Sequence, residues 1–348
     1  MSATANPTGL LADPAMGFLA PALEPEPALA AFRRPGGPLA DLDGPVRIAR
    51  IDILRHKPGR RCLIAYDIDV APRHGAPQSF TLLGKARAKG LDRHALAINQ
   101  GLWLAGIDGQ SRGGVGVPRP RGAVNEFRMW FQERVPGEDA EPVLIGPDGP
   151  DAAERIAGAL VALQRAAPVH ERRHTISDEL AILEAKLGAL ARARPDLKPD
   201  LREILDACRR LAGEIPAKDP SGIHRDFHQG NILIDGERIW IVDLDLYARG
   251  YPATDAGNLS AHLIELALRG RATTAAISAA VERFEAGWLA GWQGAASRRE
   301  LYAFTTLALA RLIAISDGFP DRRHTTGALI ELCRQQLETG APRPTAEV

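Results

Sequence analysis

Residues 222–235 read GIHRDFHQGNILID, a polar cluster enclosed by apolar residues. Its central octet, HRDFHQGN at 224–231, gathers an acid, two histidines, an arginine and two amides. Core packing gives no reason to place these side chains beside buried apolar segments, because every polar group that is buried needs a hydrogen-bond partner. The stretch therefore indicates a site of chemistry.

The spacing of the octet suggests which chemistry. H-R-D followed by four residues and Asn is the spacing of the kinase catalytic loop, where the Asp accepts a proton from the substrate hydroxyl and the Asn holds Mg²⁺. Asp226 and Asn231 occupy these two places. The segments ILI, DGER and IWIV then predict a short hairpin that ends at Asp243, where a kinase has its second metal-holding carboxylate.

The sequence around the loop predicts two lobes. Alternating segments at 46–56 and 61–70, joined by the turn KPGR, predict an antiparallel hairpin, with further strands at 79–87 and 126–135 and a helix at 91–104. Apolar residues then recur at helical spacing. We therefore expect an α+β fold. A flexible N-terminal arm (1–40) would precede a small antiparallel sheet N-lobe that binds nucleotide (41–137). A larger, mostly helical C-lobe with the catalytic loop and acceptor site (138–340) and a tail (341–348) would follow.

Charge and composition exclude several classes of partner. Lys plus Arg and Asp plus Glu both total 43, so the chain of 348 residues has no net positive charge with which to hold nucleic acid or an anionic membrane surface. No run of 18 apolar residues suggests a membrane span, and the first forty residues do not resemble a signal peptide. The three cysteines are widely separated, as in proteins of a reducing compartment. We expect a cytoplasmic protein without a nucleic-acid or membrane partner.

The chain resembles the aminoglycoside phosphotransferase and choline kinase family, whose members have a two-lobed protein-kinase-like fold. The family's H-G-D-x-H-x-x-N loop is similar to HRDFHQGN, and its I-D-x-x-x-x-G-x-P-x-x-D stretch is similar to VDLDLYARGYPATD at 242–255. The resemblance covers roughly residues 48–335. It implies that Asp226 is the general base, that Asn231 and Asp243 bind Mg²⁺, and that Asp255 braces the loop.

The resemblance extends to the nucleotide lobe. FTLLGKAR at 80–87 looks like the family's third strand, which implies that Lys85 reaches the α- and β-phosphates of ATP or GTP. HKPGRR at 56–61 looks like the turn that covers the phosphates, where Arg60 and Arg61 can touch phosphate or remain solvated. FQERVPG at 131–137 looks like the hinge, whose main chain near Glu133 and Val135 would meet the nucleotide base.

Two positions depart from the family pattern. Kinases pair the strand Lys with a Glu on the following helix, but residues 91–104 contain no Glu and only Asp92 as an acid, so Lys85 would be oriented by Asn99, Gln100 or the nucleotide. Arg225 stands where this family usually has Gly.

Two histidines of the loop and one acid that follows Asp243 are assigned supporting roles. His224 and His228 are interpreted as hydrogen-bonding braces of the loop rather than catalysts. Asp245 is open between two interpretations, because the family often has an acid there that helps to hold the loop, whereas an exposed carboxylate at a strand end would look the same.

These observations predict a phosphotransferase that moves the γ-phosphate of ATP or GTP to a hydroxyl of a small molecule such as an antibiotic, sugar or amino alcohol. Only eleven residues separate Asp243 from Asp255, which leaves no room for a phosphorylated activation loop and favours a small acceptor. Two alternatives remain open. One is a hydrolase with a metal held by H-x-D-x-H, and the other is a nucleotide-binding pseudokinase scaffold.

Overall fold

The computed structural model describes residues 9–10, 12–110, 114–168 and 171–339. The chain divides into two compact units. The first contains the described residues up to Leu104 together with Val117–Pro136, and the second contains Ala105–Gly116 and the described residues from Gly137 onward. The main passage from one unit to the other thus falls between Pro136 and Gly137.

The first unit is built on a five-stranded antiparallel sheet with the strand order β1-β2-β3-β6-β5. The predicted hairpin is confirmed, since β1 and β2 pair from Val46↔Val70 to Lys57↔Arg61, with two register shifts along the way. The predicted strand at 79–87 and helix at 91–104 also form. The elements are η1 (Gly17–Leu23), α2 (Pro25–Phe32), β1 (Val46–Lys57), β2 (Arg61–Val70), β3 (Gln78–Arg87), α3 (Arg93–Leu104), β5 (Pro120–Val124) and β6 (Met129–Glu133).

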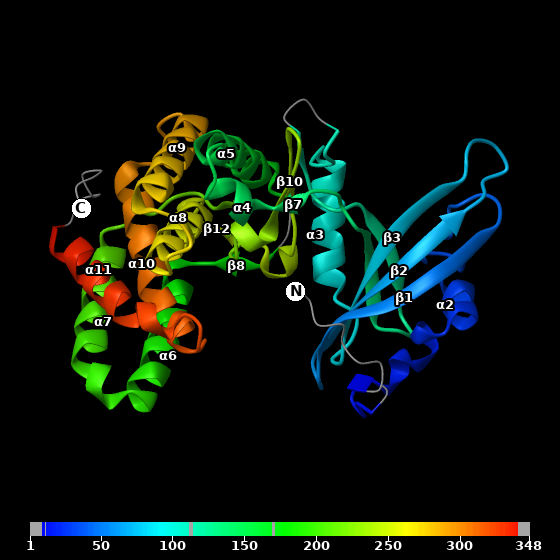
Figure 1. Ribbon diagram of the computed structural model, residues 1–348, viewed down its shortest axis with the longest axis horizontal. Coiled ribbons are helices and arrows are strands. Elements are labelled where there is room, and N and C mark those ends of the chain that lie inside the picture. Colours follow the sequence, from blue (N-terminus) through cyan, green and yellow to red (C-terminus); the bar gives the residue numbers. More distant parts are fainter. Residues whose placement is uncertain (1–8, 11, 111–113, 169–170, 340–348) are drawn as a thin grey trace. The chain divides into compact units, whose positions relative to one another are not determined.

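The expectation of a loosely held arm is wrong for the described part of residues 1–40. Helix α2 lies beside β1 (Figure 1), and the arm contributes fully buried side chains to the core of the sheet. Phe32 packs edge-on against Tyr66 and Phe131, with ring centroids 4.9 and 4.8 Å apart. The Ala/Pro-rich composition was misleading because a Pro at the first helical position favours a helix, and Pro25 begins α2.

The arm is also bonded to the turn between β1 and β2. The buried carboxylate of Asp13 accepts hydrogen bonds from the backbone N–H groups of Gly59 (2.8 Å) and Ala15 (3.0 Å) and lies 2.9 Å from Nε2 of His56. The Gly59 bond, followed by the His56 contact, lowers the pKa of Asp13. The turn that the sequence analysis assigned to phosphate binding is therefore also held by the arm.

Loss of the Phe32 ring should destabilise the first unit. We expect Phe32→Ala to lower the free energy of unfolding by ~3–5 kcal/mol, because the ring is fully buried between sheet aromatics. Glu26→Ala, at an exposed position of the same helix, is the matched control. Denaturant unfolding measures both, and equal stability of the two variants would show that the arm contributes little to the core.

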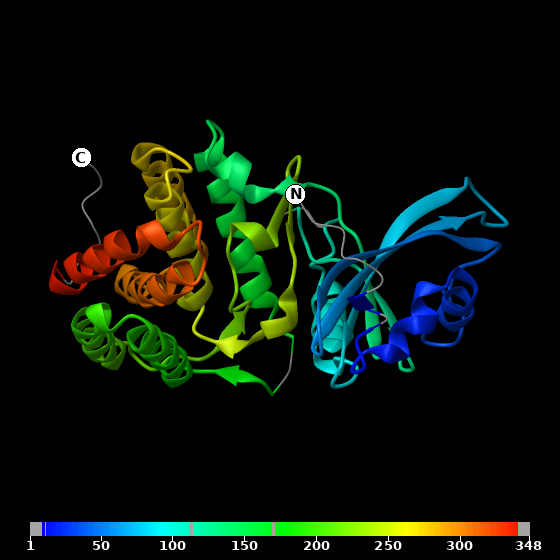
Figure 2. The ribbon, with the colours of Figure 1, turned by 60° about the horizontal axis from the view of Figure 1, so that its bottom comes forward.

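The second unit is mostly helical, as predicted, and holds two small sheets with strand orders β4-β11-β10-β7 and β8-β12-β9. Figures 1 and 2 both show α6 and α7 side by side in this unit. Its elements are β4 (Val115–Gly116), β7 (Glu138–Asp139), α4 (Ala140–Leu144), α5 (Gly149–Ala166), β8 (Arg173–His174), α6 (Ile176–Ala193), η2 (Pro195–Leu197), α7 (Lys198–Gly213), β9 (Ser221–Ile223), η3 (Gln229–Asn231), β10 (Ile232–Asp235), β11 (Arg238–Ile241), η4 (Leu244–Leu246), β12 (Ala248–Gly250), α8 (Ala253–Leu268), α9 (Thr274–Trp292), α10 (Arg298–Asp317), η5 (Arg323–Thr325) and α11 (Thr326–Thr339).

The helices of the second unit pack through buried aromatic and amide groups. Trp288 of α9 is fully buried, and Nε1 of Trp288 and Nε1 of Trp292 donate to Oε1 of Gln164 on α5 at 3.1 and 3.2 Å. Gln164 in turn donates to Asp255 at the start of α8. Nowhere in the described part of the chain is a helix long and apolar enough to cross a membrane.

Candidate active site

The octet HRDFHQGN forms the loop between β9 and β10, and one apolar residue anchors it. Phe227 is fully buried, whereas the side chain of its neighbour Asp226 is 49% exposed. The buried ring of Phe227 therefore anchors the loop in the protein interior, while the carboxylate of Asp226 faces solvent. This is the arrangement that a base acting on a diffusible substrate requires.

Asp255 holds the backbone at the start of the loop. Its fully buried carboxylate accepts hydrogen bonds from the N–H groups of His224 (2.8 Å) and Arg225 (2.7 Å), and from Nε2 of Gln164 (3.2 Å). Burial raises the pKa of Asp255, and these hydrogen bonds oppose that rise. Asp255 thus bonds the main chain of the first two residues of the loop, and its bracing role stays a prediction.

The backbone of Arg225 explains why Gly suits this position. Its φ is 72°, in the left-handed region where a side chain costs roughly 1–2 kcal/mol and Gly costs nothing. The hydrogen bond from its N–H to buried Asp255 helps to hold this conformation. Its Nη1 lies 3.4 Å from the carbonyl oxygen of Leu246.

His224 connects the loop to the strand end that precedes Asp243. The ring is fully buried, its Nε2 donates to the carbonyl of Val242 at 2.8 Å, and its Nδ1 accepts from the N–H of Asp226 at 3.3 Å. One ring nitrogen therefore bonds within the loop, and the other bonds to the strand end before Asp243.

Asn231 connects Asp226 to Val242, the residue that precedes Asp243. Its Nδ2 donates to the carbonyl of Asp226 at 2.8 Å and lies 3.4 Å from Oδ2 of the same residue. Its backbone carbonyl accepts from the N–H of Val242 at 3.0 Å, so Asp243 follows directly on the bonded pair. Asp243 has φ 63° and ψ 53°, a left-handed conformation that an Asp tolerates better than most residues.

These residues fit a magnesium ion. The amide nitrogen of Asn231 is engaged with Asp226 and His228, which leaves its amide oxygen for a ligand, and Asp243 offers a partly exposed carboxylate. Amide and carboxylate oxygens are the donors that Mg²⁺ prefers, and in nucleotide sites one or two of them suffice because phosphates supply others. A larger protein cage is not required.

The geometry does not gather the ligands of the alternative H-x-D-x-H metal site. His224 has both nitrogens occupied, and His228 accepts from the N–H of Gly230 through Nδ1 (3.1 Å), with its Nε2 4.0 Å from Asp226. Within the described ranges, no three His, Cys, Asp or Glu side chains converge as metal ligands. The hydrolase interpretation has no structural support.

One residue beside the loop was missed by the sequence analysis. His262 of α8 stacks on His228, with ring centroids 4.9 Å apart and an interplanar angle of 28°. Burial lowers the pKa of His262 well below its usual value, and neighbouring cationic groups add to this effect. A signal was present, because Asp255, Asn258 and His262 recur at spacings of three and four, which places them on one helix face.

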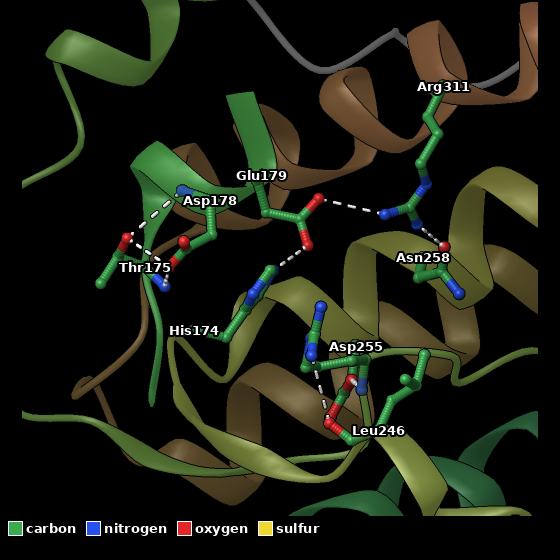
Figure 3. Close-up of polar contacts among 9 residues, drawn as sticks. His174, Thr175, Asp178, Glu179, Leu246, Asp255, Asn258 and Arg311 are labelled. Atoms are coloured by element: carbon green, nitrogen blue, oxygen red, sulfur yellow. Dashed lines mark hydrogen bonds and ion pairs between the residues drawn. The ribbon is translucent and has the colours of Figure 1, made fainter. Parts of the chain in front are cut away.

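Asn258 connects the loop to a buried network (Figure 3). Its Nδ2 donates to the carbonyl of Phe227 at 2.9 Å, and its Oδ1 accepts from Arg311 of α10. Figure 3 shows Glu179 between Arg311 (3.0 Å) and His174 (2.6 Å). Burial raises the pKa of Glu179, but its bonds to His174 and Arg311 outweigh burial and lower it overall. The network joins α6, α8 and α10 to the loop.

Asp245 lies in the short helix η4 that follows Asp243. Its side chain is partly exposed, and its backbone carbonyl accepts a hydrogen bond from Nη1 of Arg172 at 3.1 Å. The main chain at this position therefore helps to fix η4, and a supporting role for the carboxylate stays a prediction.

The nucleotide-binding candidates lie in the first unit. Lys85 of β3 pairs with Trp130 of β6, and its Nζ lies 5.3 Å from the centroid of the Trp130 ring. Arg60 is exposed in the β1–β2 turn, and Arg61 begins β2 and is partly exposed. The phosphate-binding roles of both arginines stay predictions.

The strand pairing of β6 reduces the number of main-chain groups that the predicted hinge can offer to a nucleotide base. The N–H of Glu133 donates to the carbonyl of Arg119 at 2.9 Å, and its carboxylate accepts from Nε of Arg121 at 2.6 Å. The Glu133 N–H is therefore committed to the sheet rather than open to a nucleotide base. Val135 lies in the segment that follows the strand.

The acids and amides near the predicted helix have other partners. Asp92 accepts from the N–H of Ala95 at 3.0 Å and pairs with Arg87 at 2.7 Å, so it caps α3. Buried Asn99 donates to the carbonyl of Ala95 at 2.7 Å.

Taken together, a unit built on an antiparallel sheet, a mostly helical unit, and an H-x-D loop with a downstream Asn and a strand-end carboxylate define a kinase-like phosphotransferase. A family model described as "Phosphotransferase enzyme family" matches residues 102–303, which is more than half of the chain. The chain therefore belongs to the phosphotransferase enzyme family, and the predicted resemblance and class, a small-molecule kinase, are confirmed.

Solved structures support the same fold. A choline/ethanolamine kinase family protein from Mesorhizobium loti is 17% identical, with a TM-score of 0.54 and coverage of 89% of this chain and 94% of that chain. The GDP and kanamycin complex of APH(2″)-IIIa is 14% identical (TM-score 0.53; 90% and 99% covered). Glucosamine kinase in complex with glucosamine, ADP and inorganic phosphate is 13% identical (TM-score 0.53; 98% and 100% covered). A comparison with curated proteins found no match.

Proposed function

We propose that the chain transfers the γ-phosphate of ATP or GTP to a hydroxyl of a small molecule, with Asp226 as the base and Mg²⁺ held by Asn231 and Asp243. The observation that carries this proposal is the double attachment of Asn231. Its side chain binds Asp226 and its carbonyl binds the N–H of Val242, so one residue positions the base and the strand end together.

Each residue has a defined task in the transfer. The carboxylate of Asp226 is half-exposed, while its own N–H and carbonyl are fixed by His224 and Asn231, so it can accept a hydroxyl proton without moving its backbone. A bound Mg·nucleotide would supply the phosphoryl group, and its Mg²⁺ would neutralise the charge that develops during transfer. The oxygens of Asn231 and Asp243 would hold that ion.

The choice of a small acceptor rests on the segment between Asp243 and Asp255. Its residues are accounted for by η4, by β12, which pairs with β8 and β9, and by the first turn of α8. This segment provides no long loop for a protein substrate. The ADP and GDP complexes of glucosamine kinase and APH(2″)-IIIa support a nucleotide donor and leave the choice of base open.

A screen for acceptor-dependent ADP or GDP release tests the function. The purified chain is incubated with Mg·ATP or Mg·GTP and a panel of hydroxyl-bearing sugars, amino alcohols and antibiotics, and products are checked by mass for one added phosphate. Nucleotide binding without phosphorylation of any panel member would favour the pseudokinase scaffold. A phosphorylated product would exclude it.

Lys85 provides a separate test of the nucleotide lobe. We expect Lys85→Ala to weaken Mg·ATP binding or slow turnover about tenfold or more, because the ammonium group would bind the α- and β-phosphates. Lys89→Ala is the matched control, since Lys89 is exposed beyond the end of β3. Calorimetry and ADP release measure both variants. Equal effects of the two substitutions would contradict the assignment of Lys85.

A further inference from the structure

Asp13, in the arm, holds the turn between β1 and β2 through a buried carboxylate. Its side chain is 5% exposed, accepts from the N–H of Gly59 at 2.8 Å and lies 2.9 Å from Nε2 of His56. Its own backbone is fixed as well, since its N–H donates to the carbonyl of Leu10 (3.1 Å) and its carbonyl accepts from the N–H of Met16 (3.0 Å). A hydrogen-bonded segment of the arm therefore determines where the turn lies.

Attachment of the arm to the sheet does not require this acid. Leu19 and Phe32 of the arm are fully buried in the core of the first unit, and apolar burial of this kind holds a segment against a sheet. Burial of an ionised carboxylate is costly unless hydrogen bonds compensate for it, and apolar residues in its place are often at least as stable. The bonds of Asp13 therefore indicate a task at the turn beyond attachment.

The strand register places His56 and a row of cations on opposite faces of the sheet. His56 pairs with Cys62, which belongs to the buried core, whereas the next pair is Lys57 with Arg61. Because side chains alternate along a strand and cross-strand partners share a face, Lys57 and Arg61 lie on the face opposite to the core. Arg61 also pairs with Arg87 of β3. These three residues form a cationic row across β1, β2 and β3.

The cationic row suits a polyanion such as the phosphates of a nucleotide. Like charges that lie directly opposite each other on neighbouring strands are destabilising, and an anion with several oxygens relieves this repulsion. Arg87 also pairs with Asp92 at 2.7 Å. Lys85, for which phosphate binding is proposed above, pairs with Leu63, two residues along from Arg61, and so lies on the face of the row.

We propose that Asp13 is a positioning residue for the nucleotide: by holding Gly59 and His56, it fixes the turn so that the cationic row meets the phosphates. The N–H of Gly59 is committed to Asp13, so the binding of phosphate falls to side chains. Lys57 and Arg61 follow any shift of the turn, because they are the strand residues on either side of it. This inference rests on the proposed transfer from a nucleotide and adds a residue of the arm to it.

Ligands with and without phosphates test this inference. Asp13→Asn keeps the size of the side chain, but an amide cannot accept all the hydrogen bonds of the carboxylate. Calorimetry measures the affinity for Mg·ATP and for adenosine, or for Mg·GTP and guanosine if GTP is the donor, with no acceptor present. Glu26→Gln removes a charge at an exposed position of the same arm and is the matched control.

We expect Asp13→Asn to lower the affinity for Mg·ATP about tenfold and to leave the affinity for adenosine unchanged, since only the phosphates meet the cationic row. Arg61→Gln should have the same selective effect. The double variant should lose less affinity than the two separate losses multiplied, because Asp13 acts through the row. His56→Gln keeps the bond from Gly59 and should give about a threefold selective loss, which covers the case in which Asp13→Asn does not fold. Glu26→Gln should bind as wild type.

Three results would overturn the role of Asp13. Equal losses for Mg·ATP and adenosine would show that the residue supports only the fold of the first unit. Affinities equal to those of Glu26→Gln would show that it only fastens the arm, and an unchanged ratio of the two affinities in His56→Gln would have the same meaning if Asp13→Asn does not fold. Tighter binding of Mg·ATP by Asp13→Asn would show that the bond hinders the nucleotide.

The same measurements separate this role from the proposed transfer. If Asp13→Asn shows the selective loss but the acceptor screen gives no phosphorylated product, the positioning role stands and the transfer fails. If wild type binds Mg·ATP no more tightly than adenosine, the cationic row is not a phosphate site and the role of Asp13 is rejected. A phosphorylated product in the screen would then leave the transfer intact.

Discussion

Replacement of Asp226 by Asn should lower turnover by ~10²–10⁴-fold and leave the affinity for Mg·ATP near that of wild type. The substitution keeps the shape of the side chain and removes the base. The backbone of this residue is fixed by His224 and Asn231 through its N–H and carbonyl, so the loop should keep its conformation. Calorimetry with Mg·ATP and ADP release with an acceptor, or background ATP hydrolysis, measure the two effects.

A neighbouring acid controls for the loss of charge alone. Asp235 ends β10 in the same hairpin and is partly exposed, with an Arg238 nitrogen 3.9 Å away. Asp235→Asn should therefore leave turnover unchanged. Undiminished turnover in Asp226→Asn would remove the basis for the kinase interpretation of HRDFHQGN, whereas a parallel loss of nucleotide binding would show that this residue acts on the metal rather than on the acceptor.

The fold was predictable where its signals are local. Strands β1 and β2 alternate apolar and polar residues and are joined by a tight turn, so pattern and turn chemistry agree within 25 residues of chain (46–70). The arm was not predictable in this way. Phe32 meets its partners at Tyr66 and Phe131, which are distant in sequence, and a short Ala/Pro-rich segment carries no local sign of such packing. Composition alone favoured the wrong outcome.

In the candidate site too, contacts within one loop were predictable from the sequence, whereas contacts between distant segments were not. Asp226 and Asn231 are five residues apart, and their hydrogen bond follows from one loop, so spacing was sufficient to pair them. His262 comes from α8, and only tertiary packing brings it against His228 of the loop. The left-handed conformation of Arg225 has no signal in the residue itself, and only the family's usual Gly at this position points to it.

Substitution of Asp243 should have a different effect from that of Asp226, because it changes the metal site. We expect Asp243→Asn to lower the affinity for nucleotide in the presence of Mg²⁺ at least about tenfold and to remove most of the turnover. Asn is preferred to Ala here because φ is 63° at this position, and Asn tolerates the left-handed region. Affinity measured with Mg²⁺ chelated should be equal in the variant and in wild type.

The comparison of the Asp243 and Asp226 variants separates metal binding from base catalysis. Mg²⁺ should increase nucleotide affinity in wild type and in Asp226→Asn but not in Asp243→Asn, since only the last variant loses a ligand of the ion. Glu237→Gln, in the turn of the same hairpin and 92% exposed at its side chain, should behave as wild type. If Mg²⁺ increases nucleotide affinity in Asp243→Asn as much as in wild type, this carboxylate does not hold the ion. The pairing of Asn231 with Val242 would then position the base alone, and the metal would have to be bound by other oxygens.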